Sequence, residues 1–249
     1  MPVTSTRRMH PQTRKRHQGA APQTPGWNWV AMGQMGLTGW TRVAAKPLAR
    51  AIARRTGRPE AQILALIYYP GCEEVPESVA VNIRNRSYAI SAQVTIDTAG
   101  AAGVLFAHGC RFGGHALYVK DGKLKYVYNS VGEFEQIVES GKPVPAGDCV
   151  LSASFEKSGT GMPTEGMLSL YINQEKVGEQ KIKTQPAKFS LAGEGLNVGL
   201  DRAEPVTDDY PGTSPWAFTG GTIHKVIVDV AGDPWVDLEK EVRAAFARD

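Results

Sequence analysis

The sequence has few cysteines and no long hydrophobic run, and both shortages limit what the chain can be. Its 249 residues include only three cysteines, Cys72, Cys110 and Cys149, which cannot all pair and form no disulfide framework. The longest apolar stretch, Ile63 to Tyr69, is far shorter than the roughly 18–20 apolar residues that a membrane span needs. We therefore expect a cytoplasmic protein with reduced thiols and no membrane contact.

Motifs that carry common enzyme chemistry are also missing. The sequence has no P-loop, no GxGxxG after a strand, no GxSxG, no HExxH and no CxxC. The nearest candidates for paired acid and base groups, Glu73, Glu74 and Glu77, lie in a short segment that contains Pro70 and Pro76. They do not lie on strands that would bring two carboxylates together across a cleft, so the sequence gives no support to a glycosidase-like hydrolase.

Charge divides the chain into two unlike parts. Residues 1–60 contain eleven Lys and Arg and one acid, Glu60, whereas the remainder holds 17 of the 28 bases and 24 of the 25 acids. We interpret residues 1–67 as a basic leader that is disordered or partly helical, with short helices over 43–56 and 59–67. Such a segment is typical of a solvated tail; the alternative, a nucleic-acid tail, is not favoured.

From residue 68 onward the pattern changes to that of a sheet. Ser87 to Ile96 alternates between apolar and polar residues, as a half-buried strand does, and Val104 to Ala107 is a short run typical of a strand buried on both faces. Asp121-Gly122 is a strong hairpin signal between two further strands. Other strands are expected at 116–120, 124–128, 149–156, 167–173, 176–183, 196–200 and 222–230.

These strands predict a mainly β domain over residues 68–249. No helix separates them, so we expect an antiparallel two-sheet sandwich or jelly roll rather than a parallel α/β sheet. A helix should end the chain, because Asp233 can cap it and Pro234 fits its first turn. Its apolar stripe should pack on the sandwich. The stripe consists of Trp235, Leu238, Val242 and Phe246.

One dense polar cluster, residues 108–115, allows two interpretations. His108, Cys110 and His115 are legitimate zinc ligands, but their spacing matches no common zinc module. The favoured interpretation is a glycine-rich connection between two strands, in which Gly109 and Gly113 supply turn conformations.

The long loop after residue 200 carries a second set of candidates. Asp201, Asp208 and Asp209 are acids of the kind that hold calcium in sandwich lectins, although solvated loop acids are the simpler interpretation. Aromatic side chains could bind a sugar ring by stacking, with core packing as the alternative. The four candidates are Tyr210 and Trp216 in the loop and Tyr126 and Tyr128, which share one strand face.

Four blocks of sequence, in this order, resemble the C-terminal region of long bacterial arylsulfatases of the actinobacterial type. They are Tyr68 to Tyr88 (YYPGCEEVPESVAVNIRNRSY), Gly103 to Asn129, Gly195 to Asp201 (GLNVGLD) and Phe218 to Glu241. In that family the region follows the catalytic domain and resembles a concanavalin-like sandwich. The resemblance therefore implies the same sandwich and, as partners, a sulfatase catalytic domain or further copies of the chain.

The sequence departs from that family in the residues that perform the chemistry. Sulfatases carry Cys/Ser-x-Pro-x-Arg, whose first residue becomes formylglycine, and no such motif occurs here. Residues 1–67 are also too few for the α/β catalytic domain. We therefore expect no catalytic residue in the chain. Two functions stay open: an accessory domain, which should expose an apolar patch near residues 63–69, and a free carbohydrate-binding module, which should expose aromatic residues.

Overall fold

The computed structural model describes residues 63–98, 100–186, 188–189, 194–202 and 204–232. The two predictions that concern the ends of the chain, a basic leader before residue 63 and a helix after residue 232, lie outside these ranges. Within them, no helix is long and apolar enough to cross a membrane. The described part of the chain is built from strands, as the alternating pattern predicts.

Eleven strands make up the described part of the chain. They are β1 (Ile63–Tyr68), β2 (Ser87–Ile96), β3 (Gly103–Cys110), β4 (Gly113–Lys120), β5 (Lys123–Ser130), β6 (Phe134–Pro143), β7 (Gly147–Ser158), β8 (Thr164–Ile172), β9 (Glu175–Thr184), β10 (Leu196–Val198) and β11 (Gly221–Ala231).

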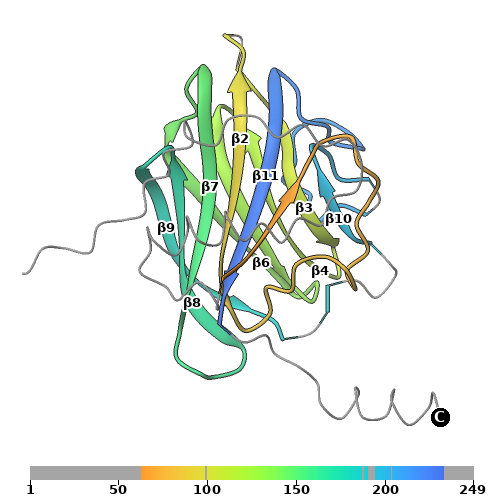
Figure 1. The fold of residues 1–249 in the computed structure, drawn as a ribbon, viewed down its shortest axis with the longest axis vertical. Coiled ribbons are helices and arrows are strands. Elements are labelled where there is room, and N and C mark those ends of the chain that lie inside the picture. Colours follow the sequence, from red (N-terminus) through yellow and green to blue (C-terminus); the bar gives the residue numbers. More distant parts are fainter. Residues whose placement is uncertain (1–62, 99, 187, 190–193, 203, 233–249) are drawn as a thin grey trace, which may run out of the picture.

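The strands form two antiparallel sheets that pack face to face as a sandwich. The six-stranded sheet has the order β1-β11-β2-β7-β8-β9, and the five-stranded sheet has the order β10-β3-β4-β5-β6. Figure 1 shows the two layers, with β7, β2 and β11 in front of β3, β4 and β6. This confirms the predicted fold class, a mainly β antiparallel sandwich.

The predicted hairpins are present with the expected turns. Asp121 and Gly122 both have positive φ, 52° and 71°, which matches the twist of the flanking β4 and β5. β8 and β9 turn in a similar way at Asn173, with φ of 56°. Short polar residues accept this left-handed backbone at low cost, so these turns are locally favourable.

Two strands differ from the prediction. Residues 63–68 form β1, where we expected the end of a helix, and they pair with β11 so that Ile63 lies opposite Ala231. A short apolar run does not distinguish strand from helix, and the open edge of β11 decides the outcome. The sheet consequently begins within the predicted leader. β6 was not predicted at all, because its residues are mostly exposed and polar.

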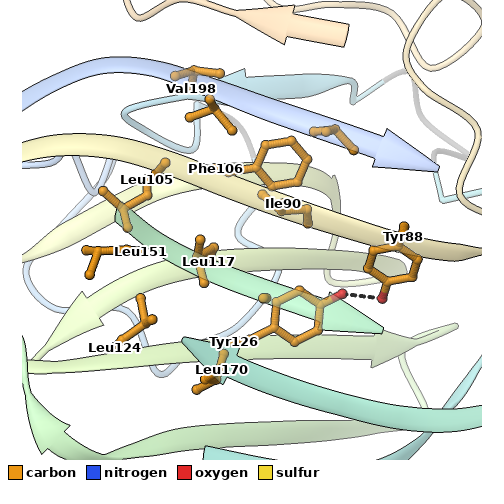
Figure 2. Packing of buried hydrophobic residues seen from close by; sticks show 14 of the residues in the cluster. Tyr88, Ile90, Leu105, Phe106, Leu117, Leu124, Tyr126, Leu151, Leu170 and Val198 are labelled. Carbon is orange, nitrogen blue, oxygen red and sulfur yellow. Dashed lines mark hydrogen bonds between the residues drawn. The ribbon is translucent and has the colours of Figure 1, made fainter. Parts of the chain in front are cut away.

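The core lies between the two sheets and combines aliphatic residues with tyrosines (Figure 2). Leu117 and Leu124 of the five-stranded sheet face Leu151 and Leu170 of the six-stranded sheet, and all four side chains are fully buried. The hydroxyls of Tyr88 and Tyr126 meet across the core at 2.6 Å (Figure 2). A buried hydroxyl without a partner is costly, so this bond fixes the relative position of the sheets.

This tyrosine pair yields a stability prediction. Tyr126→Phe should lower the free energy of unfolding by roughly 1–3 kcal/mol, because the Tyr88 hydroxyl loses its partner in the core. The double variant with Tyr88→Phe should be destabilised by less than the sum of the two single variants. Urea unfolding at pH 7 measures both effects, with Tyr69→Phe, which removes an exposed hydroxyl, as the control. Additive effects would show that the two hydroxyls are not coupled.

Candidate functional site

The outer face of the five-stranded sheet is apolar and is covered by residues 201–202 and 204–218, which we call the strap. Val104, Ala107, Ala116, Tyr118 and Val127 form this face. From the strap, three side chains pack on them: Val206, Tyr210 and Trp216. Burial on both faces explains why every residue of β3 is buried, as its continuous apolar run predicts. The strap therefore occupies the broad surface on which a ligand would otherwise lie.

A partly buried carboxylate fastens the middle of the strap to the sheet. Asp209 accepts hydrogen bonds from the Tyr118 hydroxyl at 2.6 Å and from Lys120 and Lys125 at 2.7 and 3.0 Å. Burial alone would raise the pKa of Asp209, but these three donors outweigh it and hold the pKa at about 2. The carboxylate thus stays ionised and paired at neutral pH.

A second buried carboxylate lies at the start of the strap. Asp201 is 2% exposed and accepts a hydrogen bond from the Val206 N–H at 3.2 Å. Burial raises its pKa to about 6, and the negative charges of Glu74 and Glu194 add to the rise, whereas the Val206 N–H and the Tyr210 hydroxyl oppose it. This acid therefore ionises only near neutral pH.

The three acids proposed as calcium ligands go to separate partners. Asp201 accepts a hydrogen bond from the strap backbone, Asp208 forms an ion pair with Arg111, and Asp209 forms ion pairs with the two lysines. Among the described residues, no group of three or more His, Cys, Asp or Glu side chains is arranged to hold a metal ion. The strap acids as they stand do not form a calcium ligand shell.

The four aromatic candidates are also placed by this arrangement. Tyr126 and Tyr128 share one face, as their spacing predicts, but that face is the core and both side chains are buried. Tyr210 of the strap is buried against the sheet, and Trp216 packs beside it with ring centres 5.7 Å apart. In this structure these rings serve packing, which is the alternative that the sequence left open.

The polar cluster 108–115 lies mostly on strands rather than in a connection. His108 of β3 and His115 of β4 are directly paired across the sheet and face the core, with ring centres 5.6 Å apart. His115 Nδ1 contacts the Tyr126 hydroxyl at 3.2 Å, while its Nε2 and both ring nitrogens of His108 have no hydrogen-bond partner among the described residues. Burial lowers the pKa of His108 to about 3, aided by the charge of Arg84, and holds the pKa of His115 well below 6.5.

Exposed apolar side chains that the sequence did not indicate lie at the hairpin end beyond this histidine pair. The short turns β3–β4 and β5–β6 lie at the same end of the sheet and expose Phe112, Val131 and Phe134, which we call the apolar tip. These side chains are 51%, 45% and 46% exposed. Among the described residues only four other large apolar side chains are exposed, and they lie elsewhere along the chain: Tyr69, Val79, Met162 and Met167.

The two turns of the apolar tip are held against one another. A Cβ placed on Gly132 would lie only 3.0 Å from the Arg111 carbonyl oxygen, so the turns are in direct contact. The Val131 N–H donates to the buried Gln185 side chain at 2.9 Å, and the Gly132 N–H donates to Asn129 at 3.0 Å. The tip is therefore a preorganised surface.

Val131 adopts a backbone conformation that its side chain disfavours. Its φ is 47°, and that of Gly132 is 77°, so the turn resembles the one at Asp121-Gly122. The left-handed region costs an ordinary residue roughly 1–2 kcal/mol, and for a β-branched residue it is a genuine outlier. Exposed apolar side chains and local strain thus coincide at the tip, which makes it the candidate functional site.

An apolar patch was expected near residues 63–69 if the chain lacks a partner domain. The structure places Tyr68 in the core as part of β1 and leaves Tyr69 only 39% exposed. Three of the seven exposed large apolar side chains of the described residues lie together on the tip instead. Sequence reasoning missed Phe112 and Phe134 because only the register of β3 to β6 brings them together.

Comparisons with known proteins find only distant likenesses, all of them to solved structures. No family model and no curated protein matches the chain. Among solved structures it is similar to a heptameric SAP-like pentraxin from Limulus polyphemus, with 13% identity over 68% of this chain and 73% of that one, and a TM-score of 0.38. It is also similar to the CBM40 of a Ruminococcus gnavus IT-sialidase, with 15% identity, 70% and 95% coverage, and a TM-score of 0.39.

A third similar structure is the galectin LEC-6 of Caenorhabditis elegans, with 11% identity over 65% of this chain and 94% of that one, and a TM-score of 0.33. All three identities are low, so these likenesses concern the arrangement of strands and leave the function to the geometry of this chain.

The buried histidine pair yields a pH prediction. A buried His with a lowered pKa must take up a proton on unfolding, so it leaves stability unchanged above pH 6.5 and destabilises the protein as pH falls toward 3. Linkage gives about 2 kcal/mol at pH 5 for His108 alone. His108→Leu should therefore lose less stability than the wild type between pH 7 and pH 5 in urea unfolding. Asp201 titrates in both proteins, so its contribution cancels when the two pH dependences are compared.

The matched control is His224→Leu, which removes a histidine on the outer, exposed part of β11. Its stability should depend on pH as that of the wild type does. Equal slopes for His108→Leu and the wild type would contradict the buried, neutral state of His108.

Proposed function

We propose that the chain is a non-catalytic carbohydrate-binding module that holds its ligand on the apolar tip. The observation that carries this proposal is the exposure of two phenyl rings, Phe112 and Phe134, on two touching turns. Sugar rings bind by laying their apolar C–H faces on aromatic side chains, while their hydroxyls bond to polar groups around them.

The fixed backbone of the tip supports this function. Rings held by rigid turns lose little freedom on binding, and the bonds of Val131 and Gly132 to Gln185 and Asn129 supply that rigidity. Polar side chains stand close by, since Arg111 follows β3 and forms ion pairs with Glu204 and Asp208 of the strap. The tip thus offers both an apolar surface and hydrogen-bonding groups.

A second candidate is an accessory domain that packs on a sulfatase catalytic domain, as the sequence resemblance implies. The observation in its favour is Val131, which adds to the tip an exposed aliphatic side chain that cannot bond to a sugar hydroxyl. An apolar centre with a charged rim is also the pattern of a protein interface. In this case the tip would be buried by the partner domain.

Substitutions in the tip test the proposed function. Phe112→Ala and Phe134→Ala should each weaken binding of an oligosaccharide found on a glycan array by roughly 1–2 kcal/mol, or 5- to 30-fold, because each removes one ring. Isothermal titration calorimetry, with and without calcium, measures the loss. Since both rings are exposed, stability should change by no more than about 0.5 kcal/mol.

The matched control is Met167→Ala, which removes an equally exposed apolar side chain from the six-stranded sheet. It should leave binding unchanged. Val131→Asn adds a second check, because it should stabilise the fold by about 1 kcal/mol by relieving the turn while altering the binding surface.

A separate assay distinguishes the second candidate. The chain is mixed with a separately expressed sulfatase catalytic domain, and arylsulfatase turnover and complex formation are measured. Stimulated turnover that is lost in Phe112→Ala, together with an empty glycan array, would replace the carbohydrate proposal by the accessory one. Light scattering on the chain alone reports whether the tip instead joins two copies.

A further inference from the structure

The apolar tip carries an excess of negative charge around its rim. Arg111 precedes Phe112 in the β3–β4 turn, and its guanidinium is already paired, with Glu204 at 2.6 Å and Asp208 at 3.8 Å. Glu133 lies in the β5–β6 turn before Phe134, and Glu135 follows Phe134 on β6. Four carboxylates therefore lie next to the tip residues in sequence or are paired with Arg111 beside them.

Few positive charges balance these carboxylates. Besides Arg111, the described residues near the tip include Lys188, whose carbonyl accepts a bond from the same Gln185 side chain that holds Val131. The lysines farther along the sheet, Lys120 and Lys125, are engaged by Asp209. The rim thus has a formal charge of about −2, from four acids and two bases.

The titration of Glu135 agrees with this crowding. Burial raises its pKa, the Thr207 hydroxyl at 2.6 Å lowers it, and the negative charges of Asp208 and Asp209 raise it again. The strap and the β5–β6 turn therefore bring carboxylates of different segments close enough to repel one another.

Carboxylates of this kind suit one class of sugar better than another. The hydroxyls of an uncharged sugar donate hydrogen bonds, and ionised carboxylates are strong acceptors for them. A sulfate or carboxylate group on the sugar would instead meet repulsion from each rim acid. At a separation of 8 Å one such pair costs about 0.5 kcal/mol in water and about 2 kcal/mol near a protein surface.

We infer that the apolar tip binds uncharged oligosaccharides and rejects their sulfated or otherwise anionic counterparts. This inference rests on the proposed carbohydrate-binding function and adds the chemical class of the ligand. Phe112 and Phe134 carry the sugar ring, while Glu133, Glu204 and Asp208 accept bonds from its hydroxyls and exclude negative charge.

The test compares matched ligands on the full chain. Neutral oligosaccharides of hexose, pentose and N-acetylhexosamine units are each measured beside their sulfated derivatives by calorimetry, in 20 mM and 500 mM NaCl. The neutral member should bind at least about 10-fold more tightly at low salt. The ratio should shrink at high salt, because the Debye length falls from roughly 20 Å to about 4 Å.

Charge-neutral variants show whether the rim causes the preference. Glu133→Gln with Asp208→Asn removes two rim charges and leaves the bond between Arg111 and Glu204 in place. This pair of substitutions should reduce the preference at low salt by at least about 3-fold. The matched control is Asp121→Asn with Glu156→Gln, which removes two charges from the opposite hairpin end and from the six-stranded sheet and should leave the preference unchanged.

The outcomes separate the inference from the function on which it rests. Tighter binding of the sulfated member, still sensitive to Phe112→Ala, would overturn the inference and leave the carbohydrate-binding function in place. A preference for neutral ligands that both double variants preserve would also overturn it, because the rim would then not be the cause. Binding of no saccharide of either kind would remove the function and the inference together.

Discussion

The five-stranded sheet is apolar on both faces, and the need to cover both is the constraint on which the rest of the structure depends. The six-stranded sheet covers one face, and the strap covers the other with Val206, Tyr210 and Trp216. Among the described residues, a sheet covered in this way leaves open to solvent the ends of its hairpins and the polar edge strand β6. The exposed rings of Phe112 and Phe134 lie at such an end. The position of the candidate site follows from the covering of the sheet.

Polar contacts fix where the strap lies, more than they add to its stability. Keeping Asp201 ionised inside the protein costs about 3 kcal/mol at pH 7, given a pKa of about 6 instead of 3.8. Asp209 is favourable, because its partners keep it ionised, but ion pairs that are partly exposed to solvent add little to stability. Each group does, however, accept a bond at one defined point. Together with the pair of Arg111 and Glu204, they set the distance between the strap and the tip.

Strands with a clear period were predictable from the sequence, whereas anything set by long-range pairing was not. The alternation in β2 and the Asp121-Gly122 turn are local signals, and the strand and the turn are confirmed, although Ala89 and Ser91 on the other face of β2 are buried as well. The spacing of Tyr126 and Tyr128 also predicted that they share a face. Which of the two faces becomes the core, however, depends on how the sheets stack. The tip could not be predicted without the strand pairing, since its two rings come from turns that only the pairing of β3 to β6 places side by side.

Locally unfavourable choices gather at the tip end of the sheet, and this supports a function there independently of exposure. Val131 occupies a left-handed turn position for which Asp121 is chosen at the opposite end of the same strands. In the same hairpin as Phe112, three buried ring nitrogens of His108 and His115 have no partner in the described part of the chain. A sequence shaped by stability alone would avoid both, since local preferences and fold agree in most of a natural protein. The cost at position 131 serves to present an apolar side chain to solvent, which a binding surface requires and a turn does not.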